Sequence, residues 1–582
     1  MKHASPAIVA QSAVRRLPRW ALLLFCLAYV LPGFIGREPW KGADMAEFGY
    51  MAELARGGVS WLHPQLMGLV PEVDGLLAYW LGAWAIQLAP SALASELASR
   101  IPFALLLGLA MWATWWGTYF LALSPKAQPV AFAFGGEALP TDYARAIADG
   151  GLLALIACLG LAQLSHETTP AQIQLSFSAL TFYAFAALPY RTALPMLLGT
   201  VGLAGLTLSG APSLAVVLGL GGVLLGLLDR SEPHQPDSDS PINYRRKLMA
   251  LVGVTLALAG LASWLELWQW RIVLPQAQWL VWRNLGRSLL WFTWPAWPLA
   301  LWSLWRWRQQ ISSGEISRHL ALPLWFVLVA LLTTLLTSAS HRSLLLALPA
   351  LATLAAFALP TLQRSVAALI DWFTLLFFSG CGLIIWIVWL AMQTGFPAQP
   401  AANVMRLAPG FTASFSLLPF LLALFATSAW IWLVMWRVGR HRAAIWKSLV
   451  LPAAGAALCW LLLMSLWLPL LDYARSYAPL VSQANKLVGK NDCVEVQGLS
   501  RAQIAALRHQ AQFKLTPTNA TMHCPWLLLS SEQRADKAVD LQQWRWHSSL
   551  RRLGERSDNM QLYQRKNPMA LRESAPTPPT TH

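Results

Sequence analysis

The chain has 582 residues, of which 56% are hydrophobic and only 12% are charged, and its mean hydropathy is +0.47. Soluble proteins carry about 25% charged residues. Apolar runs of about 20 residues, the length needed to cross a hydrocarbon core, recur from residue 20 to residue 471. Composition therefore excludes a soluble protein and predicts a polytopic α-helical membrane protein. The net charge of +16 is typical of basic cytoplasmic loops, so it indicates no nucleic-acid partner.

The first apolar run, at 20–36, follows Arg15, Arg16 and Arg19. No small-residue cleavage site precedes Gly36, and further apolar runs follow. These features favour a retained first helix over a cleaved signal peptide. We expect a retained membrane span whose N-terminal side is cytoplasmic.

Basic loops mark the cytoplasmic side of the later spans, because Lys and Arg collect there. Counting between these loops predicts about thirteen spans, at 20–36, 101–123, 149–164, 174–190, 195–209, 213–228, 248–264, 293–307, 320–338, 343–360, 369–392, 413–436 and 448–471. The aromatic stretch at 76–90 is short for a span and breaks the alternation, so we expect it to lie in the membrane interface. Residues 37–100 then form one periplasmic loop with interfacial helices, inside a transmembrane domain at 1–471.

Beyond Leu471 the sequence becomes polar. The stretches at 492–499 and 524–531 are typical of short strands, and 500–513 is typical of a helix capped by Ser500. We predict a periplasmic α+β domain at 472–565, followed by a disordered tail at 566–582. Because the periplasm is oxidising, we expect Cys493 and Cys524 to form a disulfide; the alternative is two buried free thiols.

Carboxylates lie directly after the first span, in the stretch 40–58 ("WKGADMAEFGYMAELARGG"). Asp44 and Glu47 have the spacing of a capping box, in which the first side chain caps a helix and the fourth reaches back to it. A helix of this kind would end at Arg56, before two glycines. The functional alternative is that Asp44 is a general base for a hydroxyl acceptor, and a cap would also hold such a base in place.

The same loop adds three ionisable side chains, those of His63, Glu72 and Asp74. Three roles are open for these side chains. They could contact the donor or the acceptor of a group-transfer reaction, form a weak metal site, or be charges of the loop that water solvates. No cofactor is implied, and a divalent metal stays open. Further along, Glu167 in "SHETT" interrupts two spans on the outer side, where it could bind sugar hydroxyls or cap the next helix.

Two groups of cations fall on the predicted outer side. Arg283 and Arg287 precede the aromatic "WFTWPAWP", and they suit either a lipid phosphate or ordinary snorkelling to headgroups. His341 and Arg342 lie in a short outer loop, where the positive-inside rule argues against a cation without a partner. A bound phosphate would supply that partner.

Several of these segments together resemble a known family. The stretches "DMAEFGYMAELARGGVSWLHPQLMG", "LLAYWLGA", "WFTWPAWPLALW" and "HRSLLLALPALATLAA" are similar in order and spacing to motifs of the GT-C superfamily. The resembling branch is the bacterial lipid-linked sugar transferases, which include lipid A aminoarabinose transferases and protein mannosyltransferases. The resemblance covers about residues 20–470, and the C-terminal domain lies outside it. The family motif departs at Met45 and Phe48, and Asp74 stands near the position of a family lysine.

The resemblance implies a GT-C-like bundle and an inverting glycosyltransferase that takes a sugar from a polyprenyl-phosphate donor. The acceptor would be lipid A, another glycolipid or glycan, or a protein. The family's catalytic acid falls on Asp44, a second acidic position on Glu167, and a basic position on Arg342. Substrate contacts are expected from Glu47, His63, Glu72, Asp74, Glu167, Arg283, Arg287, His341 and Arg342. The rival function is a lipid or sugar transporter or flippase without transferase activity. The ionisable groups argue against it, because they gather at the interface rather than at mid-membrane.

Overall fold

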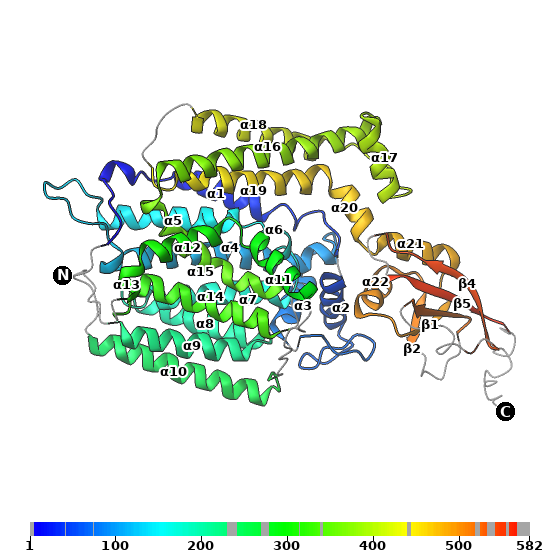
Figure 1. Ribbon diagram of the computed structural model, residues 1–582. Helices are drawn as coiled ribbons and strands as arrows, with labels where there is room; N and C mark the ends of the chain where they lie inside the picture. Colours follow the sequence, from blue (N-terminus) through cyan, green and yellow to red (C-terminus); the bar gives the residue numbers. More distant parts are fainter. Residues whose placement is uncertain are drawn as a thin grey trace.

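The computed structural model describes residues 5–40, 42–73, 75–229, 241–268, 279–312, 315–337, 341–438, 444–517, 524–531, 540, 542–553 and 558–566, without the side chains of 241, 242, 281, 341 and 438. Its larger part is a bundle of long apolar helices that run side by side (Figure 1). In lipid the backbone must satisfy its own hydrogen bonds, and within one segment only a helix does so. The predicted polytopic helical fold is confirmed.

Each predicted span overlaps a helix of this bundle, although several bounds differ. The helices are α1 (Arg19–Val30), α4 (Ser95–Ala122), α5 (Pro140–Ala157), α7 (Pro170–Ala187), α8 (Ala193–Leu208), α9 (Pro212–Leu228), α10 (Pro241–Trp264), α12 (Ala296–Arg306), α14 (Arg318–Leu336), α15 (Leu348–Ala356), α16 (Arg364–Thr394), α18 (Leu417–Val438) and α19 (Lys447–Leu466). Within the described ranges, 7 helical segments are long and apolar enough to cross a membrane by length and composition. The predicted span at 343–360 combines α15 with the 3-10 turns η3 (His341–Ala347) and η4 (Leu359–Thr361).

Shorter elements connect these helices. They are η1 (Gln11–Ala13), α2 (Gly42–Arg56), α3 (Leu77–Leu88), η2 (Pro125–Ala127), α6 (Leu161–Leu164), α11 (Trp279–Phe292), α13 (Arg308–Ser312), α17 (Ala398–Leu407), α20 (Leu468–Arg475) and α21 (Ala478–Leu487). The stretch predicted to be interfacial contains α3, which packs against α2 and α4.

The bundle core lies where α4, α5, α7 and α15 meet. Membrane helices approach closely where their side chains are small, and Gly151 of α5 is such a position. A Cβ atom there would lie 2.9 Å from the Thr118 hydroxyl oxygen of α4. That hydroxyl is also 2.8 Å from the Thr353 hydroxyl of α15, so three helices meet at one buried point.

The C-terminal domain contains one five-stranded sheet in the order β2-β1-β3-β5-β4. Its strands are β1 (Cys493–Gln497), β2 (Lys514–Pro517), β3 (Trp526–Ser530), β4 (Trp544–Leu550) and β5 (Met560–Arg565). β1 pairs in parallel with β2 and β3, whereas β5 pairs antiparallel with β3 and β4. A disulfide joins Cys493 at the start of β1 to Cys524 just before β3, with an S–S distance of 2.15 Å.

Helix α22 (Arg501–Gln510) follows β1 and connects it to β2. Its predicted cap is confirmed: the Ser500 hydroxyl accepts a hydrogen bond from the Gln503 backbone N–H, and the Gln503 side chain accepts one from the Ser500 N–H. This capping box satisfies two backbone donors that a helix start leaves without partners.

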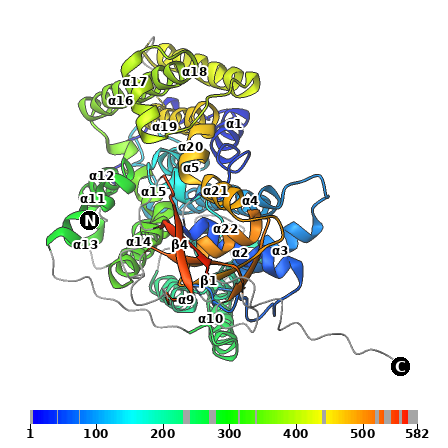
Figure 2. The same ribbon diagram turned by 90° about the vertical axis from the view of Figure 1, so that its right-hand side faces the viewer.

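The C-terminal domain covers one end of the bundle. Helix α2 runs across that end, and α22 packs against its outer side (Figure 1). Figure 2 looks onto this end, where α21, α22 and the sheet lie over α2. Side chains at 44–54 of α2 are all buried as a result, and this buried helix carries the residues that the sequence singles out.

Candidate active site

Asp44 lies inside the first turn of α2, because the helix begins at Gly42. The predicted capping box of Asp44 and Glu47 is therefore wrong, because Asp44 lies within the helix and not at the residue before it. The Asp44 carboxylate instead reaches back to the backbone N–H of Trp40, whose nitrogen is 3.2 Å from Oδ2. The helix does end at Arg56 as predicted, and Gly57 adopts the left-handed conformation with φ +81°.

The Asp44 carboxylate is completely buried and is held from several sides. Its Oδ1 accepts hydrogen bonds from the backbone N–H and the hydroxyl of Thr168, both at 2.9 Å. Its Oδ2 is 3.1 Å from Arg37 Nη2 and 3.8 Å from Arg100 Nη2. The adjacent segment, which contributes Arg37, and two distant ones, which contribute Arg100 and Thr168, therefore meet on one carboxylate.

These partners decide the charge of Asp44. Burial by itself raises the pKa of a carboxyl group. The guanidinium groups of Arg37 and Arg100, together with the Thr168 hydrogen bonds, outweigh burial and lower the pKa of Asp44 below its ordinary value. Asp44 is consequently an ionised carboxylate at neutral pH.

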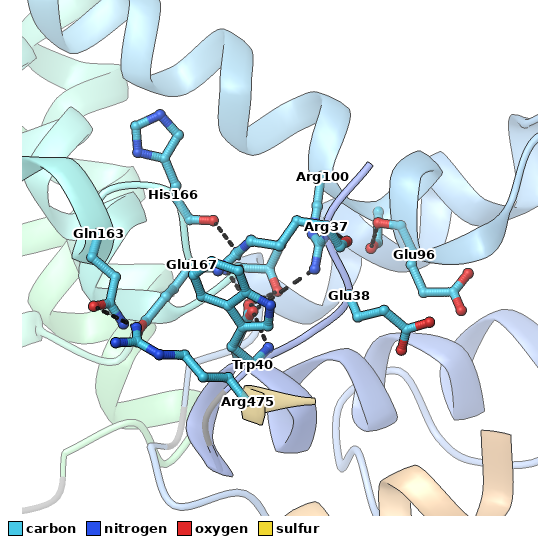
Figure 3. A network of polar contacts seen from close by, with 12 residues as sticks. Arg37, Glu38, Trp40, Glu96, Arg100, Gln163, His166, Glu167 and Arg475 are labelled. Carbon is cyan, nitrogen blue, oxygen red and sulfur yellow. Dashed lines mark hydrogen bonds and ion pairs between the residues drawn. The ribbon is translucent and has the colours of Figure 1, made fainter. Parts of the chain in front are cut away.

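One further cation, Arg475, extends this site at the indole of Trp40, and Figure 3 shows it with Arg37, Arg100 and Glu167. The guanidinium carbons of Arg37 and Arg475 lie 4.9 Å and 5.4 Å from the centre of the Trp40 ring, within the range of cation–π contacts. Arg475 belongs to α20, which leads into the C-terminal domain.

Several guanidinium donors of the site lack an acceptor. In the described part of the chain, Nε and Nη1 of Arg37 and Nη2 of Arg100 are buried without any hydrogen-bond partner. The remaining Arg37 nitrogen, Nη2, donates to the backbone carbonyl of His166 at 2.6 Å as well as to Asp44. Buried donors without acceptors are costly, and they indicate a place for an anion.

Glu167 and Arg342 form the other ion pair of the site. Arg342 Nη2 and Nε lie 2.7 Å and 3.2 Å from Glu167 Oε2, and the Glu167 carboxylate is buried. The partner that the sequence required for Arg342 is thus present in the chain itself. Of the two alternatives for Glu167, capping of the next helix does not hold, since α7 begins at Pro170 with Thr169 as its N-cap.

The guanidinium groups of the site outnumber the carboxylates that they contact directly. Arg37 and Arg100 lie at Asp44, Arg342 pairs with Glu167, and Arg475 lies over Trp40. Glu96 also interacts with the charge of Arg100. Asp472 is a further carboxyl, which contacts the Trp40 indole N–H, but burial raises the pKa of Asp472 to about 6. The excess positive charge fits an oxyanion such as a phosphate.

Glu47 lies about one turn beyond Asp44 on α2 and differs from it in environment. Its side chain is buried, and Oε2 has no hydrogen-bond partner among the described residues. Burial raises the pKa of Glu47 to about 7, against a hydrogen bond from Tyr79 that lowers it. Glu47 is therefore a second carboxyl group that could exchange a proton near neutral pH.

The other predicted contact residues are not gathered at this site. His63 is exposed in the loop, and Asp74 and the side chain of His341 lie outside the described residues. Glu72 is also exposed, but its charge helps to raise the pKa of Glu47. Arg283 and Arg287 are exposed on α11, and no hydrogen bond or ion pair within the described ranges joins them to Asp44 or its partners. As for metals, no three His, Cys, Asp or Glu side chains in the described part come together as ligands.

The sequence reasoning missed Arg37, Arg100 and Arg475 as site residues. A usable signal was present for two of them. Arg37 and Arg100 are the first and last residues of the predicted periplasmic loop, where the positive-inside bias disfavours cations. The same argument that pointed to Arg342 applies to both.

The fold defines the class of protein, a polytopic α-helical membrane protein with a small α+β domain at its C-terminal end. The crystal structure of ArnT from Cupriavidus metallidurans bound to undecaprenyl phosphate is similar, with a TM-score of 0.60 and 13% sequence identity over 94% of this chain and 98% of that one. The apo structure of the same ArnT gives a TM-score of 0.58 and 14% identity over 94% and 97%. The predicted resemblance is confirmed at the level of fold. No protein-family model and no curated protein sequence matches the chain.

Proposed function

We propose that the protein is a glycosyltransferase of the bacterial inner membrane, which transfers a sugar from a polyprenyl-phosphate donor to an acceptor on the periplasmic side. The observation that carries the proposal is the excess of buried guanidinium groups around Asp44, with Arg37 and Arg100 donors that lack acceptors. The structural similarity to an ArnT bound to undecaprenyl phosphate supports the same class of donor.

The donor phosphate would bind at these guanidinium groups, because one guanidinium group can donate two parallel hydrogen bonds to two oxygens of a phosphate. The acceptor oxygen attacks the anomeric carbon of the sugar, and the bond from that carbon to the phosphate oxygen breaks. The polyprenyl phosphate leaves with the electron pair, stabilised by Arg37, Arg100 and Arg342. The configuration at the anomeric carbon is inverted in this single displacement.

Asp44 is the proposed acceptor of the proton that a hydroxyl acceptor loses. Both of its oxygens are engaged in the described conformation. A phosphate that draws Arg37 toward itself would release Oδ2 for the acceptor. An acceptor that is itself a phosphate group is already ionised and needs no base.

The test is transfer of a radiolabelled sugar from a polyprenyl-phosphate donor in proteoliposomes that contain the full-length protein and periplasmic-side lipid or glycan acceptors. A transferase produces a new labelled glycoconjugate, and Arg37→Gln should reduce its formation strongly. If the label only moves between leaflets, the protein is a flippase and the proposal is wrong.

A further inference from the structure

A groove lies along the outside of the bundle between α1, α4 and α5. It has a volume of about 860 Å³, and it is lined along its length by apolar side chains, among them Leu23, Leu27, Leu105, Met111 and Trp112. On α4 the lining extends from residue 104 to residue 119, which corresponds to about 22 Å of helix. That length exceeds the thickness of one leaflet, about 15 Å of hydrocarbon, so it can hold an extended acyl chain.

One end of the groove is basic. Arg16, Arg19 and Arg145 line it, at and just before the start of α1 and in the first turns of α5. Arg16 is neutralised by Asp142, with Nη2 and Oδ1 2.8 Å apart. Arg19 and Arg145 make no hydrogen bond or ion pair with any residue that the structure describes.

A carboxyl group also lines the groove, that of Asp149, whose oxygens already accept hydrogen bonds. Asp149 is buried, and its carboxylate accepts hydrogen bonds from the Trp115 indole N–H at 2.9 Å and from the Leu17 backbone N–H at 3.4 Å. Asp142 and Asp149 both interact with the charge of Arg145, whereas no ion pair within the described residues involves Arg19. The mouth of the groove is therefore complementary to an anion with an apolar tail.

We propose that this groove binds one anionic glycerophospholipid of the leaflet opposite the C-terminal domain, with its phosphate at Arg19 and Arg145 and an acyl chain along α4. Basic pockets between transmembrane helices on the cytoplasmic side are a common form of lipid headgroup site. The site is separate from the Asp44 site and does not depend on the proposed transfer activity. A polyprenyl phosphate of the active site would carry its phosphate at the other end of the bundle.

The glycine at position 108 gives a sharp test. A Cβ atom at Gly108 would meet no other atom within 4 Å, and Gly108 lines the groove. Gly108→Leu should therefore fill the groove without disturbing the packing. Gly253 of α10 is the matched control, because its Cβ direction is equally open and it does not line the groove.

The measurement is native mass spectrometry of the full-length protein with added phosphatidylglycerol or phosphatidylcholine. We expect one retained phosphatidylglycerol in preference to phosphatidylcholine. Its affinity should fall about tenfold or more in the double variant Arg19→Gln Arg145→Gln, because each arginine near a headgroup contributes about 1 kcal/mol. A similar fall is expected in Gly108→Leu, because the new side chain fills the groove. Gly253→Leu should bind as the wild type does.

Three results would overturn the proposal. They are equal retention of the two lipids, unchanged binding in the double arginine variant, and displacement of phosphatidylglycerol by undecaprenyl phosphate. The last result would assign the groove to the donor's tail. Should Gly108→Leu fail to fold, the arginine variant decides the matter, because both side chains lie at the rim.

Discussion

The carboxylate of Asp44 balances two buried guanidinium groups, those of Arg37 and Arg100, and this balance determines what a substitution does. Removing one partner of a buried ion pair costs about 3–5 kcal/mol, because the other charge stays buried without compensation. Asp44→Asn keeps an oxygen for the Thr168 bonds but loses the charge. Asp44 therefore stabilises the folded state, in addition to any role in the reaction.

We predict that Asp44→Asn lowers the thermal stability of the protein and reduces transfer to a hydroxyl acceptor by about 10²–10⁴-fold, the usual contribution of a general base. The double variant Asp44→Asn Arg37→Gln should recover part of the stability, since it removes one of the unbalanced cations. Melting temperatures and the proteoliposome assay measure the two effects. Transfer by the single variant Asp44→Asn within about tenfold of the wild type would show that Asp44 acts only as a counter-charge.

The Glu47 carboxyl makes the stability of the protein depend on pH. Burial raises the pKa of Glu47 from 4.5 to about 7, so between these values the folded state binds a proton that the unfolded state has lost. Stability from this group therefore falls as pH rises from 4.5 to 7 and is constant above that range. At pH 8 the cost reaches about 3 kcal/mol.

We predict that Glu47→Gln is more stable relative to the wild type at pH 8 than at pH 5, as measured by thermal unfolding at both values. Transfer should stay within about tenfold of the wild type if Asp44 is the base. A loss of transfer in Glu47→Gln as large as that in Asp44→Asn would instead assign the proton acceptor to Glu47.

At the scale of elements, the contact of α2 with α22 holds the site closed from outside. A Cβ atom on Gly49 would come within 2.5 Å of the Ala505 Cβ atom, so the two helices pack with almost no side chain between them. Glu53 of α2 also forms two bonds with the Arg508 guanidinium, at 3.0 Å and 3.2 Å. Close packing and charge together fix α22 on α2.

We predict that Gly49→Ala destabilises the protein by about 1–3 kcal/mol, as extra methyl groups in packed interiors do, although alanine favours helix. Adding Ala505→Gly should recover most of the loss, because it removes the methyl group that the new Cβ atom meets. The control is Gly58→Ala, where a Cβ atom would meet nothing within 4 Å. Equal thermal stability of Gly49→Ala and the wild type would contradict the close contact.

At the scale of the whole molecule, the C-terminal domain is tied to the first loop of the bundle. His509 Nε2 lies 2.6 Å from Glu96 Oε1, and Arg501 donates to the Val70 carbonyl at 2.8 Å. Arg552 also donates to the Arg475 backbone carbonyl. The domain thus contacts the loop and α20, both of which supply arginines to the site.

We predict that the variant Cys493→Ser Cys524→Ser lowers the unfolding free energy of the C-terminal domain by about 3–4 kcal/mol, from the entropy of a loop with a sequence separation of 31. Hydrogen exchange of β1 and β3 should increase, while exchange in α4 and α7 stays unchanged. If both cysteines are alkylated in unreduced, denatured wild-type protein, the disulfide is absent and this prediction fails.

The sequence alone determined most of the fold, for a physical reason. A membrane span must be a helix of a certain length and apolar composition, so runs such as 101–123 and 369–392 could be located without tertiary information. The cap at Ser500 and the end of α2 at Arg56 were predictable because they depend on neighbours within a few residues.

Only the tertiary structure decided the site. Thr168 reaches Asp44 across a sequence separation of 124 residues, and Glu167 and Arg342 are 175 apart. The sequence showed a carboxylate with the spacing of a helix cap, but its partners come from α4 and the loop before α7. Apolar patterns specify which segments enter the membrane, whereas helix packing decides which polar ends meet. That packing places Arg37, Arg100 and Thr168 on one buried carboxylate.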